Sequence, residues 1–169
     1  MFKKMIPNMF TFLNLTFGMM SILLTLTDNI KSAAVMILCA AFVDRYDGVI
    51  ARKLTVESAL GKELDSLCDL ISFGAAPAVL CWIVFLSNYG VIGYIVSILF
   101  PIAGAYRLAR FNVAEAKNIF VGVPITVAGA GMALIVLLSS ISSFPDLAST
   151  LIMLSLSYLM ISKIKFKKF

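Results

Sequence analysis

Two pairs of aspartates are the residues of this sequence best suited to chemistry: Asp44 with Asp47, and Asp65 with Asp69. Spacings of three and four residues place the members of each pair on one face of a helix. Four carboxylates in one cluster repel one another, and a divalent cation removes that repulsion. An all-oxygen site favours Mg²⁺, Mn²⁺ or Ca²⁺ over zinc or copper. The alternative is four solvated acids, each paired with a nearby Lys or Arg.

Small residues and one arginine lie between the two pairs. Gly48 and Ala51 leave room for a ligand or a neighbouring backbone, and Gly61 allows helices to approach closely. Arg52 carries the planar guanidinium that suits a phosphate. The chain has no His, so proton transfer falls to a carboxylate rather than an imidazole. This region predicts a metal site with room for a pyrophosphate.

Two further polar clusters accompany the aspartates. Asn8, Thr11 and Asn14 share one face of a helix and suit hydrogen bonding to a ligand; the alternative is polar contact between helices. Arg107 and Arg110, three residues apart, suit a carboxylate ligand. The alternative for the arginines is a topology signal combined with headgroup binding.

The elements that must position these residues are membrane helices. The chain is 61% hydrophobic and 14% charged, with a mean hydropathy of +1.01, which a soluble domain of this size cannot bury. Six stretches approach or exceed the roughly 20 apolar residues of a spanning helix. They are residues 9–27, 33–51, 57–86, 91–112, 121–142 and 144–163. We expect one all-α integral membrane domain over residues 1–169, with short connections between antiparallel neighbours.

The basic residues predict the orientation of these helices. Of the 14 Lys and Arg residues, only Lys31 falls on the opposite side from the rest. This asymmetry places both termini in the cytoplasm. It also accounts for the net charge of +5, so the charge requires no nucleic-acid partner. Residues 1–7 suit an interfacial segment, and residues 164–169 form a basic tail for anionic headgroups.

The aspartate region resembles the signature of the CDP-alcohol phosphatidyltransferase family. The matching residues are Asp44-x2-Asp47-Gly48-x2-Ala51-Arg52-x8-Gly61-x3-Asp65-x3-Asp69. Residues 7–125 are further similar to the membrane-integral phosphatidylserine synthase branch. The motifs are Pro7-Asn8-x2-Thr11-x2-Asn14, Ser72-Phe73-Gly74-Ala75-Ala76-Pro77-Ala78 and Arg107-Leu108-Ala109-Arg110-Phe111-Asn112.

The resemblance implies six transmembrane helices and transfer of a phosphatidyl group from CDP-diacylglycerol to the hydroxyl of L-serine, with release of CMP. The alternative acceptors are glycerol 3-phosphate and inositol phosphate. It further implies a homodimer in the cell membrane, an active site at the cytoplasmic face, and two divalent cations, Mg²⁺ or Mn²⁺, with Ca²⁺ as an alternative occupant. An ion-coupled transporter is the alternative from another class, but it predicts polar residues throughout the bilayer depth and repeated halves.

The resemblance also implies a role for each candidate residue. Asp44, Asp47 and Asp65 are expected as metal ligands, and Asp69 as both a ligand and the general base. The residues expected to contact the CDP-lipid are Asn8, Thr11, Asn14, Gly48, Ala51, Arg52, Ser58 and Gly61. The serine pocket is expected to contain Ser72, Arg107 and Arg110.

Overall fold

The computed structural model describes residues 5–54, 59–113, 120–141, 144–162 and 165–166. Its helices are α1 (Met5–Leu26), α2 (Ile30–Leu54), α3 (Ala59–Asp69), α4 (Ala76–Cys81), α5 (Gly90–Val113), α6 (Ile125–Ser139) and α7 (Asp146–Ile161). Two π-helical turns, η2 (Leu70–Ala75) and η3 (Trp82–Leu86), flank α4, and a 3₁₀ turn, η4 (Ser87–Tyr89), precedes α5. The strands are β1 (Phe120–Val121) and β2 (Lys165–Phe166).

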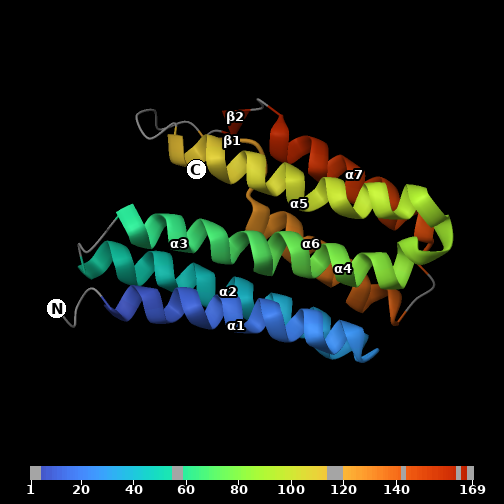
Figure 1. Ribbon diagram of the computed structural model, residues 1–169, viewed down its shortest axis with the longest axis horizontal. Helices are drawn as coiled ribbons and strands as arrows, with labels where there is room; N and C mark the ends of the chain where they lie inside the picture. The colour runs from blue at the N-terminus through green and yellow to red at the C-terminus, as the bar shows by residue number, and fades with distance from the viewer. Residues whose placement is uncertain (1–4, 55–58, 114–119, 142–143, 163–164, 167–169) are drawn as a thin grey trace.

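The helices form an elongated bundle along one common axis (Figure 1). The rod that runs from α3 through α4 lies between α1 and α5, and α6 packs against both the rod and α2. Every predicted span contains a helix, and the helices of successive spans run antiparallel, so the helical prediction is confirmed. Within the described residues, Asn8–Leu26 and Leu60–Val113 are long and apolar enough to cross a membrane, whereas α6 and α7 are shorter apolar helices.

The third predicted span departs from a regular α-helix on both sides of α4. Pro77 has no backbone N–H, and its ring crowds the carbonyl one turn earlier. The wider turn η2 precedes this proline and begins directly after Asp69. π-Helical turns are common near functional sites because they redirect side chains within a helix. Here the turn separates the acidic end of the rod from its apolar remainder.

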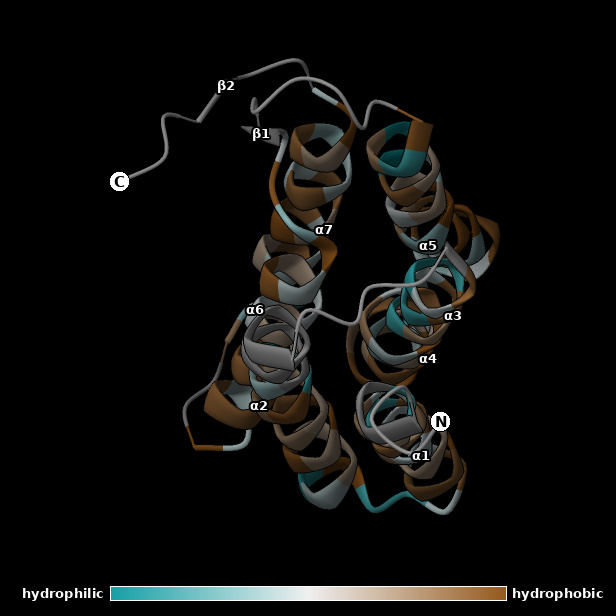
Figure 2. Ribbon diagram, turned by 90° about the vertical axis from the view of Figure 1, so that its left-hand side faces the viewer, coloured by the Kyte–Doolittle hydropathy of each residue, from teal (hydrophilic) through white to brown (hydrophobic). Residues whose placement is uncertain are grey.

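Apolar side chains cover the outward faces of the bundle. Phe12 is 51% exposed, Val91 73% and Ile98 56%. In Figure 2, brown apolar residues run along the helices, while teal polar residues gather on α3 and at one end of α5. An apolar surface of this kind is costly in water and is typical of contact with lipid. The fold therefore has the surface of a membrane protein.

A short ladder near the end of α7 is the one departure from an all-helical prediction within the described residues. β1 and β2 pair antiparallel, with Phe120 opposite Phe166 and Val121 opposite Lys165. The chain then turns at Gly122, where φ is 82° and an added Cβ would overlap the carbonyl of Met160. Because Pro124 precedes the first residue of α6, the helix begins later than the predicted span at residue 121.

Candidate active site

Three of the four predicted aspartates, one from α2 and two from α3, converge on one point. One carboxylate oxygen from each of Asp44, Asp65 and Asp69 lies within 4.8 Å of the others. Asp69 ends α3 and is 8% exposed, whereas Asp44 and Asp65 are half-buried. Asp47 lies in α2, but its side chain is outside the described residues. The converging carboxylates give this region the donor set of a hard divalent cation.

A cavity of about 440 Å³ opens on this cluster. Its walls come from α2, α3, α5 and the start of α6. The lining residues are Asp44, Arg45, Lys62, Asp65, Ser66, Asp69, Arg107, Leu108, Phe111, Asn112, Pro124 and Thr126. Acidic groups on α2 and α3 thus share one cavity with cationic groups, an arrangement suited to a metal-bound phosphate and a second anionic group.

The polar stripe of α1 faces the protein interior and is absent from the cavity lining. Thr11 is 4% exposed and Asn14 2%, while Asn8 is half-buried. Asn14 Nδ2 donates a hydrogen bond to Asp69 Oδ1 at 3.0 Å. The structure thus brings Asn14 to a predicted catalytic aspartate.

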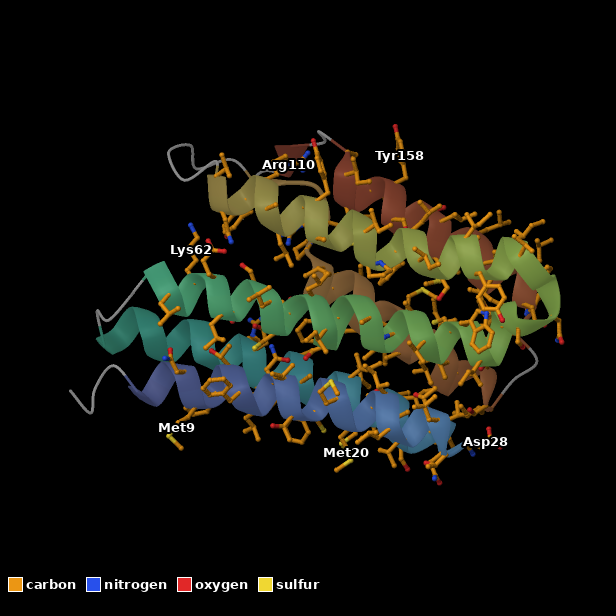
Figure 3. All side chains as sticks on the ribbon, viewed as in Figure 1. Met9, Met20, Asp28, Lys62, Arg110 and Tyr158 are labelled. Atoms are coloured by element: carbon orange, nitrogen blue, oxygen red, sulfur yellow. The ribbon has the colours of Figure 1, made fainter. Side chains whose placement is uncertain are left out.

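The two arginines predicted for the serine pocket differ in their surroundings. Arg107 lines the cavity, and its buried Nε–H has no hydrogen-bond partner among the described residues. Arg110 is not part of the lining; it donates to the carbonyls of Ile161 at 2.9 Å and Ser162 at 3.4 Å, at the end of α7. In Figure 3, Arg110 lies toward the same end of the bundle as Lys62, whereas Asp28 lies at the other.

Ser72 is also outside the cavity lining. Its hydroxyl is fully buried and donates to the backbone carbonyl of Asn14 at 3.0 Å. The π-helical turn that contains Ser72 directs its side chain toward α1. The structure therefore does not bring Ser72 and Arg110 into the cavity with Arg107.

Among the cavity residues that were not predicted from the sequence, Thr126 and Asn112 donate hydrogen bonds to other residues of the wall. Thr126, in the first turn of α6, donates to Asp44 Oδ2 at 3.3 Å. Asn112 donates to Ser66 Oγ at 3.0 Å and to Glu63 Oε1 at 3.3 Å, which links the end of α5 to α3. The only sequence signal for Thr126 is Pro124, which marks a helix start two residues earlier.

Several predicted ligand contacts fall outside the described side chains. Gly48, Ala51 and Arg52 belong to α2, in a stretch whose side chains the structure does not describe. Ser58 lies outside the described residues altogether. Gly61 lies on α3 and is half-buried.

A helical bundle with apolar outer faces is typical of a membrane protein, and its cavity contains a carboxylate cluster that could hold a metal ion. The chain belongs to the CDP-alcohol phosphatidyltransferase family, because the model of that family matches residues 4–161. This match confirms the family that the aspartate signature indicates.

Individual relatives match over nearly the whole chain. The CDP-diacylglycerol–serine O-phosphatidyltransferase of Bacillus subtilis (strain 168) is 41% identical over 165 residues, covering 97% of this chain and 90% of the relative. The enzyme of the same name from Helicobacter pylori (strain ATCC 700392 / 26695) is 36% identical, covering 96% and 72%. The archaetidylserine synthase of Methanothermobacter thermautotrophicus is also 36% identical, covering 96% and 70%.

Proposed function

We propose that this protein transfers a phosphatidyl group from CDP-diacylglycerol to the hydroxyl of L-serine, giving phosphatidylserine and CMP. The observation that carries this proposal is the shared cavity of Asp44, Asp65, Asp69 and Arg107. The cavity offers carboxylates for metal-bound phosphates beside a cation for the carboxylate of an amino acid. The names of the relatives support serine as the acceptor.

The carboxylates of Asp44, Asp65 and Asp69 fit divalent cations, because their oxygens lie within 4.8 Å of one another and offer only oxygen ligands. Asp47, one helical turn after Asp44, is proposed as a further ligand. We propose two cations, Mg²⁺ or Mn²⁺, with Ca²⁺ as an alternative occupant. When bound, they would polarise the pyrophosphate oxygens and offset the charge of the leaving group.

Asp69 is the proposed general base. It takes the proton from the serine hydroxyl, whose oxygen forms a new bond to the β-phosphorus of CDP-diacylglycerol. The bond between that phosphorus and the oxygen bridging the two phosphates breaks, and CMP leaves with the bridging oxygen. Asp69 suits this role because it is the most buried of the three clustered aspartates yet still lines the cavity.

Arg107 is the proposed partner of the serine carboxylate. Its guanidinium lines the cavity with an unsatisfied Nε–H, and an anion would use such donors in a charge-assisted hydrogen bond. Arg110 and Ser72 are better explained as supports, since their hydrogen bonds go to backbone carbonyls of α7 and α1.

The cytidine-linked lipid is proposed to enter between α2, where Gly48, Ala51 and Arg52 carry the family signature, and α3, where Gly61 continues it. We propose a multi-pass protein of the cell membrane that crosses it six times, with both termini and the active site at the cytoplasmic face. The placement of the basic residues supports this orientation. A homodimer is proposed from the family resemblance alone.

The test is CMP release by purified protein with CDP-diacylglycerol and Mn²⁺ or Mg²⁺. L-Serine, glycerol 3-phosphate and inositol phosphate are supplied in separate reactions, and an ether-linked archaeal donor replaces the diacyl donor in a parallel series. We expect release only with serine. Release with glycerol 3-phosphate or inositol phosphate but not serine would contradict the proposed acceptor.

A further inference from the structure

We propose that Asn14 is a positioning residue that holds the Asp69 carboxylate in its reactive orientation and does not contact the nucleotide of the donor. The inference rests on the proposed function, in which Asp69 is the general base. It replaces the expectation that the α1 stripe binds the CDP-lipid at this position.

The contact between Asn14 and Asp69 joins two helices that are far apart in sequence. Asn14 Nδ2 lies 3.0 Å from Asp69 Oδ1, and Asn14 is only 2% exposed. A carboxamide nitrogen only donates and an ionised carboxylate only accepts, so Asn14 must be the donor and Asp69 the acceptor of this hydrogen bond. A hydrogen bond to one carboxylate oxygen restricts rotation of the carboxylate plane, as outer groups do for metal ligands.

A second contact fixes Asn14 itself. Ser72, three residues after Asp69, donates through its hydroxyl to the Asn14 carbonyl at 3.0 Å. This approach requires Gly18, because a Cβ at residue 18 would overlap both the side chain and the backbone of Ser72. Residues 69–72 are therefore held on α1 at two points, and the side chain of Asn14 meets Asp69 in a fixed register.

The unsatisfied oxygen of Asn14 separates a positioning role from a purely structural one. Asn14 Oδ1 is buried and has no hydrogen-bond partner among the described residues. A buried unpaired acceptor destabilises a fold, so packing alone would favour an apolar side chain at this position, and the bond from Nδ2 to Asp69 is what the amide supplies instead. A group that costs stability yet contacts a catalytic carboxylate is expected where function requires it.

The experiment compares Asn14→Leu with wild type in saturation kinetics and thermal unfolding of the full-length protein. We expect kcat to fall about 10- to 100-fold, as for outer partners of metal ligands. We expect the KM for CDP-diacylglycerol to change by no more than about threefold, because no donor contact is removed. The melting temperature should fall by no more than about 4 °C, because a single hydrogen bond is lost. The preference for CDP-diacylglycerol over its 2′-deoxycytidine analogue should also be unchanged.

Ser21→Ala is the matched control, because Ser21 lies two turns further along the same buried face of α1 and its hydroxyl also has no partner among the described residues. It should leave kcat, both KM values and the ribose preference unchanged. If Asn14→Leu does not fold, Asn14→Ser is measured instead, because it replaces the amide by a smaller side chain. The same changes in kcat, KM and ribose preference then test the inference.

A large rise in the donor KM with kcat retained, or a lost ribose preference, would overturn the inference and return Asn14 to donor binding. Unchanged kcat in both variants would overturn it as well. These outcomes differ from failure of the proposed function, in which wild-type protein would release no CMP in response to serine.

Discussion

The two sides of the cavity are built differently. On the acidic side, Asp69 is buried and accepts a hydrogen bond from the side chain of Asn14. On the opposite side, Arg107 has an unsatisfied donor, and its neighbour Arg110 is tied to backbone carbonyls of α7. The acidic side is preorganised within the bundle, whereas on the cationic side the Nε–H of Arg107 remains free to donate a hydrogen bond to a ligand. We infer that the acidic side governs turnover and the cationic side governs acceptor binding.

The largest effect should come from the acidic side. Asp65→Asn removes one charge from the carboxylate cluster, and EDTA removes the proposed cations, so each should reduce CMP release to background. Asp28→Asn is the control, because Asp28 is exposed and lies at the other end of the bundle (Figure 3). Full activity of folded Asp65→Asn protein would rule out this cluster as the metal site.

Asp69→Asn should affect turnover more than donor binding. The variant keeps the shape of the side chain and one oxygen, but it cannot accept the serine proton. We expect single-turnover transfer to fall about 10²- to 10⁴-fold, the usual contribution of a general base. CDP-lipid affinity should fall by about 10-fold or less, as for loss of one ligand contact. Equal loss of donor binding in Asp69→Asn and Asp65→Asn would make Asp69 a ligand only.

Thr126→Val tests whether α6 supports the acidic side. The substitution is close in shape and removes the hydroxyl that donates to Asp44 Oδ2 at 3.3 Å. Because that bond is long, we expect the Mn²⁺ concentration for half-maximal activity to rise only about 2- to 10-fold. Thr150→Val, which removes a hydroxyl bonded within α7, should not change it. An unchanged Mn²⁺ requirement in Thr126→Val would show that the Thr126 hydroxyl does not support the aspartate cluster.

Arg110→Ala should have the smallest effect on catalysis. Loss of the bonds to Ile161 and Ser162 loosens the α5–α7 contact, so we expect a melting temperature lower by about 2–4 °C. The KM for serine should rise by no more than about threefold. A much larger, serine-specific rise would place Arg110 in the acceptor pocket after all.

The helices and the acidic cluster were predictable from sequence because both follow local rules. Apolar length gives the helices, and the helical repeat together with an antiparallel neighbour brings Asp44 toward Asp65 and Asp69. No local rule separates Arg107 from Arg110. Three residues along a helix leave them about 60° apart, which is enough for one to face the cavity and the other to reach α7.

The role of Ser72 was not predictable because it depends on a non-standard turn. A regular helix would place Ser72 one turn beyond Asp69 on nearly the same face, which suggested a pocket residue. The π-helical turn before Pro77 and the space above Gly18 direct it to α1 instead. Thr126 was missed because one threonine in an apolar helix usually bonds its own backbone.

The most direct test of the two-sided account is a pair of saturation curves for Arg107→Ala, one in serine and one in CDP-diacylglycerol. We expect the KM for serine to rise about 10- to 150-fold, since a charge-assisted hydrogen bond contributes about 1.5–3 kcal/mol. The KM for the donor should change by no more than about threefold, and Arg107→Lys should recover part of the loss. Equal increases in both KM values would contradict the account and assign Arg107 to the lipid headgroup or the diphosphate.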